Sequence, residues 1–207
     1  MGCLMRFVVP ASTSLRHFAV GLLGLATVVC GSAVAAPCSA LLDREMLRLQ
    51  DEKPQSLCRY AGQVVLVVNT ASFCGYTPQY RALEALYSRL RQRGLVVLGF
   101  PSNDFGTQEP GDNKDIAAFC ENTFGVKFPM FTKSHVSSMR TPGEGAARIN
   151  PLFADLARRT GKAPQWNFHK YLIARDGLTV TSVASDTDPR DKAFVAVVEK
   201  MLDAVEY

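Results

Sequence analysis

The sequence predicts an α/β domain in which helices flank a central mixed β-sheet. Two short segments, 64–69 and 95–100, are continuously apolar, as strands buried on both faces of a sheet are. Segments of helical periodicity lie between and after them, and two alternating segments near the C-terminal end are joined by a turn. Because strands that alternate with helices pair in parallel, we expect a parallel sheet with an antiparallel pair at one edge.

The first helix follows the strand at 64–69. Thr77 is expected to cap it, Pro78 to occupy its first position and Gly94 to end it, since these residue types favour those positions. Its buried face is predicted by apolar residues at helical spacing: Leu83, Leu86, Tyr87 and Leu90. The second strand, 95–100, follows directly.

Two more helices follow a polar loop. One is expected near 113–124 and turns inward the side chains of Ile116, Phe119 and Cys120. The other starts at Asn150, with proline next, and runs to about residue 160, where Gly161 ends it.

The chain then forms a hairpin and a last helix. Segments 169–174 and 178–184 flank the turn Arg-Asp-Gly at 175–177. Asp188 and Pro189 are expected to open the last helix, whose apolar residues are Phe194, Val197, Val198, Met201 and Val205. This order is that of an α/β sandwich of thioredoxin type, and we expect a single domain over residues 36–207.

The first 35 residues predict a secretory signal peptide. Arg6 and Arg16 precede an apolar run of about 13 residues, followed by small residues. This run is too short for a membrane span, which needs about 20 apolar residues. We expect cleavage after Ala35 and export, either to a periplasm or out of the cell. Cys30 leaves a lipid anchor open as an alternative, although the bulky Val29 before it disfavours one.

Cleavage would leave a chain of low net charge with four cysteines. Loss of Arg6 and Arg16 lowers the formal charge from +4 to +2, too little to indicate nucleic acid or an anionic surface as a partner. The scattered histidines predict no metal site. An oxidising compartment allows three pairings of the remaining cysteines, if all are bridged: Cys38, Cys58, Cys74 and Cys120.

Cys74 ends the first buried strand and precedes the first helix. Chemistry gathers at this edge of α/β sheets, and a helix N-terminus favours the ionised, nucleophilic thiolate. Residues 74–77 have the spacing of a Cys-x-x-Cys motif, with Thr77 in place of the second thiol. Such a site can attack a substrate but cannot resolve the product locally. From these residues alone, a buried structural cysteine is an equal alternative.

Four blocks resemble the glutathione peroxidase family in order and approximate spacing: NTASFCGYTPQY, LGFPSNDFGTQEPG, KFPMF and QWNFHKYL. The resemblance covers about residues 56–205. It implies a thioredoxin-like fold and reduction of hydrogen peroxide and of organic or lipid hydroperoxides through a sulfenic acid on Cys74. It also implies that Gln108, Trp166 and Asn167 complete the catalytic site. Glutathione or thioredoxin would serve as reductant, with no cofactor.

The implied residue types suit this reaction. Attack on an O–O bond needs N–H donors for the thiolate and for the leaving oxygen, and two amides and an indole supply them without titrating. Without the resemblance, Trp166 is more simply interpreted as a core residue, and Gln108 and Asn167 as loop and strand-edge amides that bond to their own backbone. Asp104 stands where relatives have glutamine and could disfavour the thiolate.

The resolving thiol is less well defined. Plant-like relatives have it at the position of Glu121, one residue after Cys120, and one residue turns a side chain by about 100° on a helix. Cys120 is therefore either a resolving thiol or a core residue. We expect a structural disulfide between Cys38 and Cys58. The long insertion of tetrameric animal members is missing, which favours a monomer or weak dimer.

The sequence leaves two other functions open. One is a thiol–disulfide oxidoreductase of the same fold, which Thr77 disfavours because it replaces the second thiol of a redox motif. The other is a redox sensor without peroxidase turnover. The sequence leaves the physiological reductant and the preferred hydroperoxide undecided.

Overall fold

The computed structural model describes residues 37–138 and 148–204, so the predicted signal peptide and Val205 lie outside the described residues. The central sheet has the strand order β4-β3-β5-β6. β3 and β4 pair in parallel, whereas β5 and β6 continue the sheet antiparallel. The predicted mixed sheet is thus confirmed. The strands are β3 (Val64–Thr70), β4 (Leu95–Pro101), β5 (Lys170–Ile173) and β6 (Val180–Val183).

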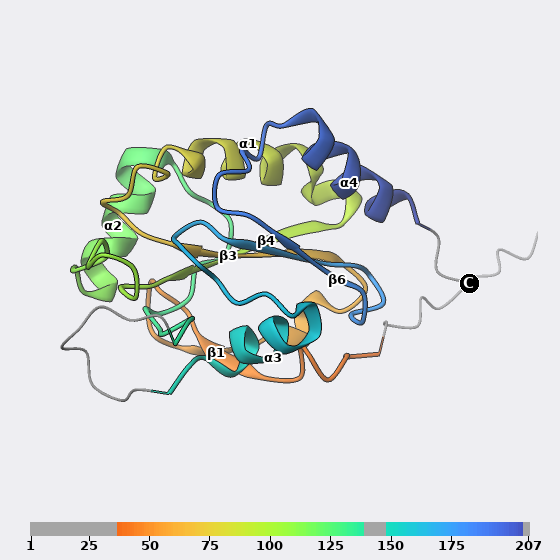
Figure 1. Ribbon diagram of the computed structural model, residues 1–207, viewed down its shortest axis with the longest axis horizontal. Coiled ribbons are helices and arrows are strands. Elements are labelled where there is room, and N and C mark those ends of the chain that lie inside the picture. Colours follow the sequence, from red (N-terminus) through yellow and green to blue (C-terminus); the bar gives the residue numbers. More distant parts are fainter. Residues whose placement is uncertain (1–36, 139–147, 205–207) are drawn as a thin grey trace, which may run out of the picture. The chain divides into compact units, whose positions relative to one another are not determined.

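Helices cover both faces of this sheet (Figure 1). Three helices lie on one face, and α3 lies on the other. Successive side chains of β3 point to opposite faces, so Val64 and Leu66 join one core cluster and Val65 joins the other. This two-sided burial is why β3 reads as a continuous apolar run. The helices are α1 (Gln79–Leu90), α2 (Asn113–Phe124), α3 (Pro151–Thr160) and α4 (Lys192–Asp203).

The last helix begins later than predicted. α4 starts after Asp191, whose carboxylate accepts the backbone N–H of Ala193 at 2.7 Å. Asp188 instead accepts the backbone N–H of Arg190 at 2.8 Å and so closes a separate tight turn before the helix. Val197, expected to face inward, is 41% exposed. The start was misplaced because Asp188 and Asp191 both resemble helix caps in sequence.

A small hairpin near the N-terminus was not expected. β1 (Glu45–Leu47) and β2 (Pro54–Ser56) pair antiparallel and lead into a 3₁₀ helix, η1 (Leu57–Tyr60). Strands of three residues are too short for an alternating pattern to be visible. The apolar residues around this hairpin, such as Leu42 and Leu57, fill the same core cluster as α3.

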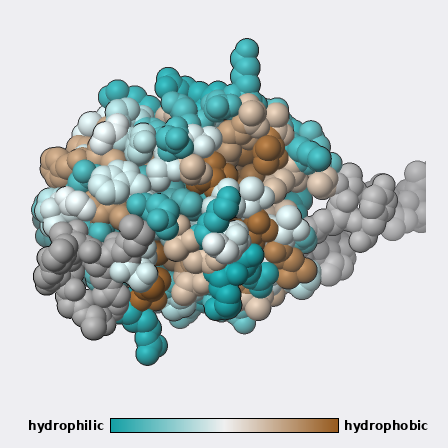
Figure 2. All heavy atoms as spheres, viewed as in Figure 1, coloured by the Kyte–Doolittle hydropathy of each residue, from teal (hydrophilic) through white to brown (hydrophobic). Residues whose placement is uncertain are grey.

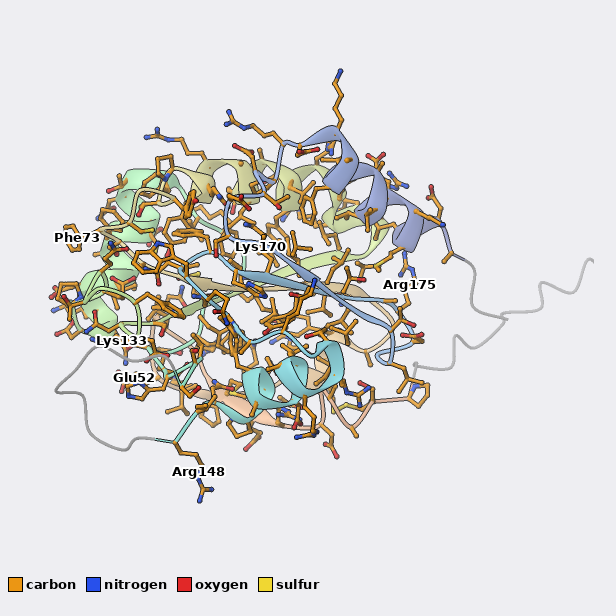
Figure 3. The ribbon with its side chains drawn as sticks, viewed as in Figure 1. Glu52, Phe73, Lys133, Arg148, Lys170 and Arg175 are labelled. Atoms are coloured by element: carbon orange, nitrogen blue, oxygen red, sulfur yellow. A yellow bond between two sulfur atoms is a disulfide. The ribbon has the colours of Figure 1, made fainter. Side chains whose placement is uncertain are left out.

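The surface combines projecting polar side chains with smaller hydrophobic areas (Figure 2). Among the large apolar residues that the structure describes, Phe73 is the most exposed at 68%, and it projects from the edge of the molecule in Figure 3. Within residues 37–138 and 148–204, no helix has both the length and the apolar character that crossing a membrane requires.

Candidate functional site

Cys74 lies in a short loop between β3 and α1. Its backbone N–H donates to the Thr77 hydroxyl at 2.9 Å, and this hydroxyl donates to the carbonyl of Ala71 at 2.9 Å. The backbone N–H of Tyr76 points to the Cys74 sulfur at 3.4 Å. The sulfur is thus held at the carboxyl edge of the sheet by a closed loop that supplies one N–H donor.

This loop corrects the prediction that Thr77 caps the first helix. The position before α1 is occupied by Pro78, which makes no side-chain capping bond. The Thr77 hydroxyl is already engaged by Cys74 and Ala71, because the chain turns tightly before the helix starts. The residue that replaces the second thiol of a redox motif therefore shapes the loop around the first.

Gln108 lies on the loop after β4. Two consecutive residues before it, Gly106 and Thr107, have positive φ values of 64° and 51°, a conformation that a β-branched residue rarely adopts. The Gln108 carbonyl accepts the backbone N–H of Phe73 at 3.0 Å, and its side-chain oxygen accepts Nδ2 of Asn167 at 2.9 Å. Gln108 therefore joins the Cys74 loop to Asn167.

Trp166 and Asn167 precede β5 in a turn fastened to the end of β3. The side-chain amide of Asn69 donates to the Trp166 carbonyl at 3.2 Å, and the Asn69 carbonyl accepts the N–H of Phe168 at 2.7 Å. Phe168 has a φ of 63°, and its carbonyl accepts the Lys170 ammonium at 2.7 Å. These bonds hold a strained turn that presents the tryptophan and the asparagine next to each other.

Asn69 and Lys170 are two supporting residues that the sequence reasoning missed. Both are completely buried. Their signal was visible, since Asn69 is a polar residue in an apolar strand and Lys170 is a charged residue directly before the apolar run 171–173. A buried polar group must find partners inside the protein, and each of these finds them in the turn that carries Trp166 and Asn167.

Trp166 is not a core residue. Its side chain is 40% exposed, and its ring lies 5.9 Å from that of Phe105. Asn167 is completely buried, and its amide bonds to Gln108 and to the carbonyl of Phe105. Among the residues that the structure describes, no hydrogen bond joins the Cys74 sulfur to Gln108, Trp166 or Asn167. The two amides are bonded to each other, and the Phe73 amide links them to the Cys74 loop.

A pocket of about 720 Å³ opens beside this turn. Tyr76, which contacts the Cys74 sulfur, and Trp166 both line it. Burial lowers the pKa of His169 in its wall to about 4, assisted by the charges of Lys170 and Lys162. His169 is therefore neutral at pH 7. The pocket gives a small molecule a polar surface next to the loop that holds the sulfur.

Asp104 does not face open space beside the site. It is buried, and its carboxylate accepts the backbone N–H groups of Val136 and Ser137 at 2.6 and 2.9 Å. His135 Nδ1 lies 2.6 Å from its other oxygen. Asp104 therefore anchors the loop that follows residue 131, where several donors compensate its charge.

Cys120 lies on the inner face of α2 and forms no disulfide. Burial raises the pKa of its thiol to about 11; the charge of Glu109 acts in the same direction, and Tyr80 opposes it. The thiol is thus protonated at neutral pH. Both interpretations of Cys120 are compatible with this position, but a resolving thiol would need α2 to move before it reached Cys74.

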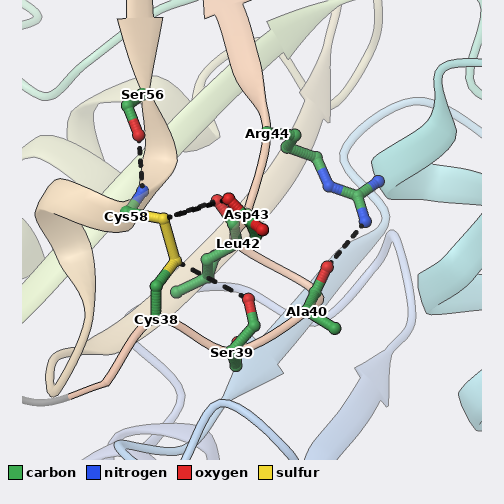
Figure 4. Close-up of a disulfide and its surroundings, with 8 residues drawn as sticks. All are labelled: Cys38, Ser39, Ala40, Leu42, Asp43, Arg44, Ser56 and Cys58. Atoms are coloured by element: carbon green, nitrogen blue, oxygen red, sulfur yellow. Dashed lines mark hydrogen bonds between the residues drawn. A yellow bond between two sulfur atoms is a disulfide. The ribbon is translucent and has the colours of Figure 1, made fainter.

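Cys38 and Cys58 are joined by a disulfide that ties the start of the described chain to η1 (Figure 4). Their sulfur atoms and the carboxylate of Asp43 lie within 4.8 Å of one another. A metal ion would need free thiolates there, and both sulfurs are used by the bridge.

Known proteins share this architecture. A family model described as glutathione peroxidase matches residues 41–142. The glutathione peroxidase homolog BsaA of Halalkalibacterium halodurans is 44% identical over 146 residues, which cover 69% of this chain and 88% of that protein. A hydroperoxy fatty acid reductase of Synechocystis is 44% identical over 162 residues, 73% and 90% of the two chains. The crystal structure of Trgpx in apo form has a TM-score of 0.61 at 29% identity, covering 81% of this chain and 98% of that one.

Proposed function

Since the chain belongs to the glutathione peroxidase family, we propose that it is a thiol peroxidase whose attacking group is Cys74. The observation that supports this most is the placement of the Cys74 sulfur. It lies at the carboxyl edge of the sheet, with an N–H donor from Tyr76. The side-chain amides of Gln108 and Asn167 are hydrogen-bonded to each other, and the Gln108 backbone carbonyl accepts the N–H of Phe73, the residue before Cys74.

The first step is attack of the Cys74 thiolate on one oxygen of a hydroperoxide. An S–O bond forms, the O–O bond breaks, and the leaving oxygen takes up a proton to become water or an alcohol. Cys74 becomes a sulfenic acid. Gln108 and Trp166 serve as uncharged donors that stabilise negative charge on the leaving oxygen, and Asn167 donates to the Gln108 side-chain oxygen and so holds Gln108 in place.

The second step returns Cys74 to its thiol. Either Cys120 condenses with the sulfenic acid to form a disulfide that thioredoxin reduces, or glutathione attacks Cys74 directly. The pocket beside Tyr76 and Trp166 offers a small thiol a place near the sulfur. No cofactor takes part in this scheme, because the thiol reductant supplies both electrons.

The protein is proposed to act outside the cytoplasm, after cleavage of residues 1–35. The disulfide between Cys38 and Cys58 supports this, since such bridges persist in oxidising compartments. A monomer or weak dimer remains the proposed assembly. Defence against hydroperoxides is the corresponding role, and lipid hydroperoxides are a candidate substrate because a relative is named as a hydroperoxy fatty acid reductase.

Stopped-flow measurement of hydroperoxide consumption tests the proposal. Wild type should turn over with glutathione or thioredoxin, and Cys74→Ser should lose turnover with both. Cys120→Ser should lose only the thioredoxin-driven rate, if that thiol resolves Cys74. Reduction of insulin disulfides without hydroperoxide turnover would show instead a thiol–disulfide oxidoreductase.

A further inference from the structure

Glu109 is a buried acid that the two steps above do not use. Its side chain is completely buried, and neither carboxylate oxygen has a hydrogen-bond partner among the described residues. Burial raises the pKa of this carboxyl to about 7. The neighbouring Ser72 and the positive charge of Lys133 act to lower the pKa, although Ser72 is not in ordinary hydrogen-bond geometry with the carboxylate. A buried carboxyl without partners is costly to a fold, and its residue type suits proton transfer at neutral pH.

The position of Glu109 is between the two segments that carry the free cysteines. It lines a pocket of about 370 Å³ with Ser72 and Phe73, which directly precede Cys74. Residues of α2, among them Ile116 and Phe119, also line it, whereas the Cys120 side chain on the same helix borders a separate, smaller pocket. The negative charge of Glu109 also contributes to the raised pKa of the Cys120 thiol.

Other ionisable groups face Glu109 from each neighbouring element. Tyr80 approaches from α1, and Asp115 and Cys120 belong to α2. Lys133 donates to the backbone carbonyl of Glu109 at 3.3 Å. Since the lysine binds this carbonyl, and also that of Gly111, it does not form an ion pair with the carboxylate.

Cys120 needs a base if it is to attack Cys74. With a pKa of about 11, only about one thiol in 10⁴ is ionised at pH 7. Glu109 is a buried acid that lines one pocket with residues of both segments, and it exchanges a proton near neutral pH.

We propose that Glu109 carries the proton in the reaction that joins Cys120 to oxidised Cys74. Its carboxylate takes the proton of the Cys120 thiol, and the resulting thiolate attacks the Cys74 sulfenic sulfur. The S–S bond forms as the S–O bond breaks. The leaving hydroxide takes the proton from the Glu109 carboxylic acid and departs as water, which regenerates the carboxylate. The oxidising equivalents come from the hydroperoxide already consumed.

This inference rests on the proposed resolving role of Cys120. The test uses the full mature protein, reduced and then mixed with one equivalent of hydrogen peroxide. Sulfenic acid on Cys74 is trapped with dimedone, and the Cys74–Cys120 disulfide is followed by mass spectrometry. Trp166, the single tryptophan, reports each step by its fluorescence.

Glu109→Gln keeps the shape of the side chain but cannot carry a proton. It should form sulfenic acid within twofold of the wild-type rate, which also shows that it folds, and form the disulfide 10²–10⁴-fold more slowly. Glu121→Gln makes the same change at an exposed position beside Cys120 and should match wild type. In wild type, the disulfide-forming rate should rise with pH and level off above about 7 as the carboxylate appears. In Glu109→Gln the slow remaining rate should follow the ionisation of the Cys120 thiol and rise steadily with pH, without an inflection near 7.

The failures are distinguishable. Equal disulfide-forming rates in wild type and Glu109→Gln would overturn the role of Glu109 alone. If Glu109→Gln does not fold, the wild-type protein alone decides the question. A disulfide-forming rate without an inflection near pH 7 would then overturn the role of Glu109. If no Cys74–Cys120 disulfide forms in wild type, the resolving role of Cys120 falls, and the role of Glu109 with it, while peroxide reduction by Cys74 still stands.

Discussion

At the scale of single residues, the site depends on polar groups buried in positions that apolar residues usually fill. Asn167 is completely buried, yet its amide nitrogen bonds to Gln108 and to a backbone carbonyl. Its side-chain oxygen has no partner among the described residues. An unsatisfied buried acceptor costs about 1–3 kcal/mol, so Asn167 is better explained by the bond with which it holds the Gln108 side chain than by stability.

Asn167→Ala should therefore lower kcat/KM for hydrogen peroxide by roughly 10²–10³, since Gln108 is no longer held as a preorganised donor. Circular dichroism should show an intact fold. Gln165→Ala removes an exposed amide two residues away and should leave the rate unchanged. Equal rates in wild type and Asn167→Ala would remove this residue from the proposed site.

Lys170 is a second residue whose burial has a measurable effect. Burial lowers its pKa to about 7, and Asp186 and Asp188 partly oppose this. Its ammonium donates to the carbonyls of Phe168 and Ser185. In the unfolded chain the same group has a pKa near 10.5. Between these values the unfolded state binds more protons than the folded state, so stability rises as pH increases.

The free energy of unfolding of wild type should therefore rise relative to that of Lys170→Met between pH 7.5 and 9. The slope expected is about 1.4 kcal/mol per pH unit. Urea unfolding at several pH values measures it, and taking the difference between the two proteins cancels other titrating groups. Lys162→Met, at an exposed lysine, should parallel wild type. A constant difference between wild type and Lys170→Met would contradict the buried titration.

At the scale of elements, the loop between β3 and α1 is organised by one hydroxyl. Thr77 accepts from the Cys74 amide and donates to the Ala71 carbonyl, and its side chain is buried. A hydroxyl at this position therefore has a role that a second cysteine could not fill, since sulfur forms weaker hydrogen bonds.

Thr77→Ala should lower the free energy of unfolding by about 1–3 kcal/mol, because two buried backbone groups lose their partner. It should also slow sulfenic acid formation, since the Cys74 loop is no longer closed. Thr77→Ser keeps the hydroxyl and should recover most of both losses. Chemical denaturation and stopped-flow fluorescence provide the two measurements; a serine variant as impaired as the alanine variant would rule out the hydroxyl as the cause.

At the scale of the whole molecule, the disulfide fastens the start of the described chain to the domain. Cys38 and Cys58 are 20 residues apart in sequence. Closing a loop of this length stabilises a protein by about 3 kcal/mol in the chain-entropy model. The bridge lies by η1, whereas Cys74 lies at the end of β3, so its effect should be confined to stability.

The double variant Cys38→Ser/Cys58→Ser should unfold at a lower temperature by an amount equivalent to about 3 kcal/mol. Its peroxidase rate at 25 °C should equal that of wild type. Calorimetry and the peroxide assay test both statements. Wild type unfolded in the presence of a reductant serves as the control and should behave as the variant does; a lost peroxidase rate in the folded variant would connect the bridge to the site.

Much of the fold could be predicted because its signals are local. The apolar runs of β3 and β4, the helical periodicity of α1 and the turn before β6 each lie within a few consecutive residues. The errors arose where two residues of the same type compete for one role, as Asp188 and Asp191 do before α4. β1 and β2 were not predicted because a strand of three residues is too short to show an alternating pattern.

For the site, the residue types and their spacing were sufficient to nominate Cys74, Gln108, Trp166 and Asn167. That Thr77 closes the Cys74 loop, and that Gln108 and Asn167 are hydrogen-bonded, could be seen only in the folded protein. The same holds for Asn69 and Lys170, which support the turn before β5, and for the unpaired carboxyl of Glu109. Asn69 and Trp166, or Gln108 and Asn167, are far apart in the chain and meet only because the sheet brings their segments together. The bonds of Thr77 and Lys170 are local, but they form only because the fold buries these side chains, and no local sequence pattern records that burial.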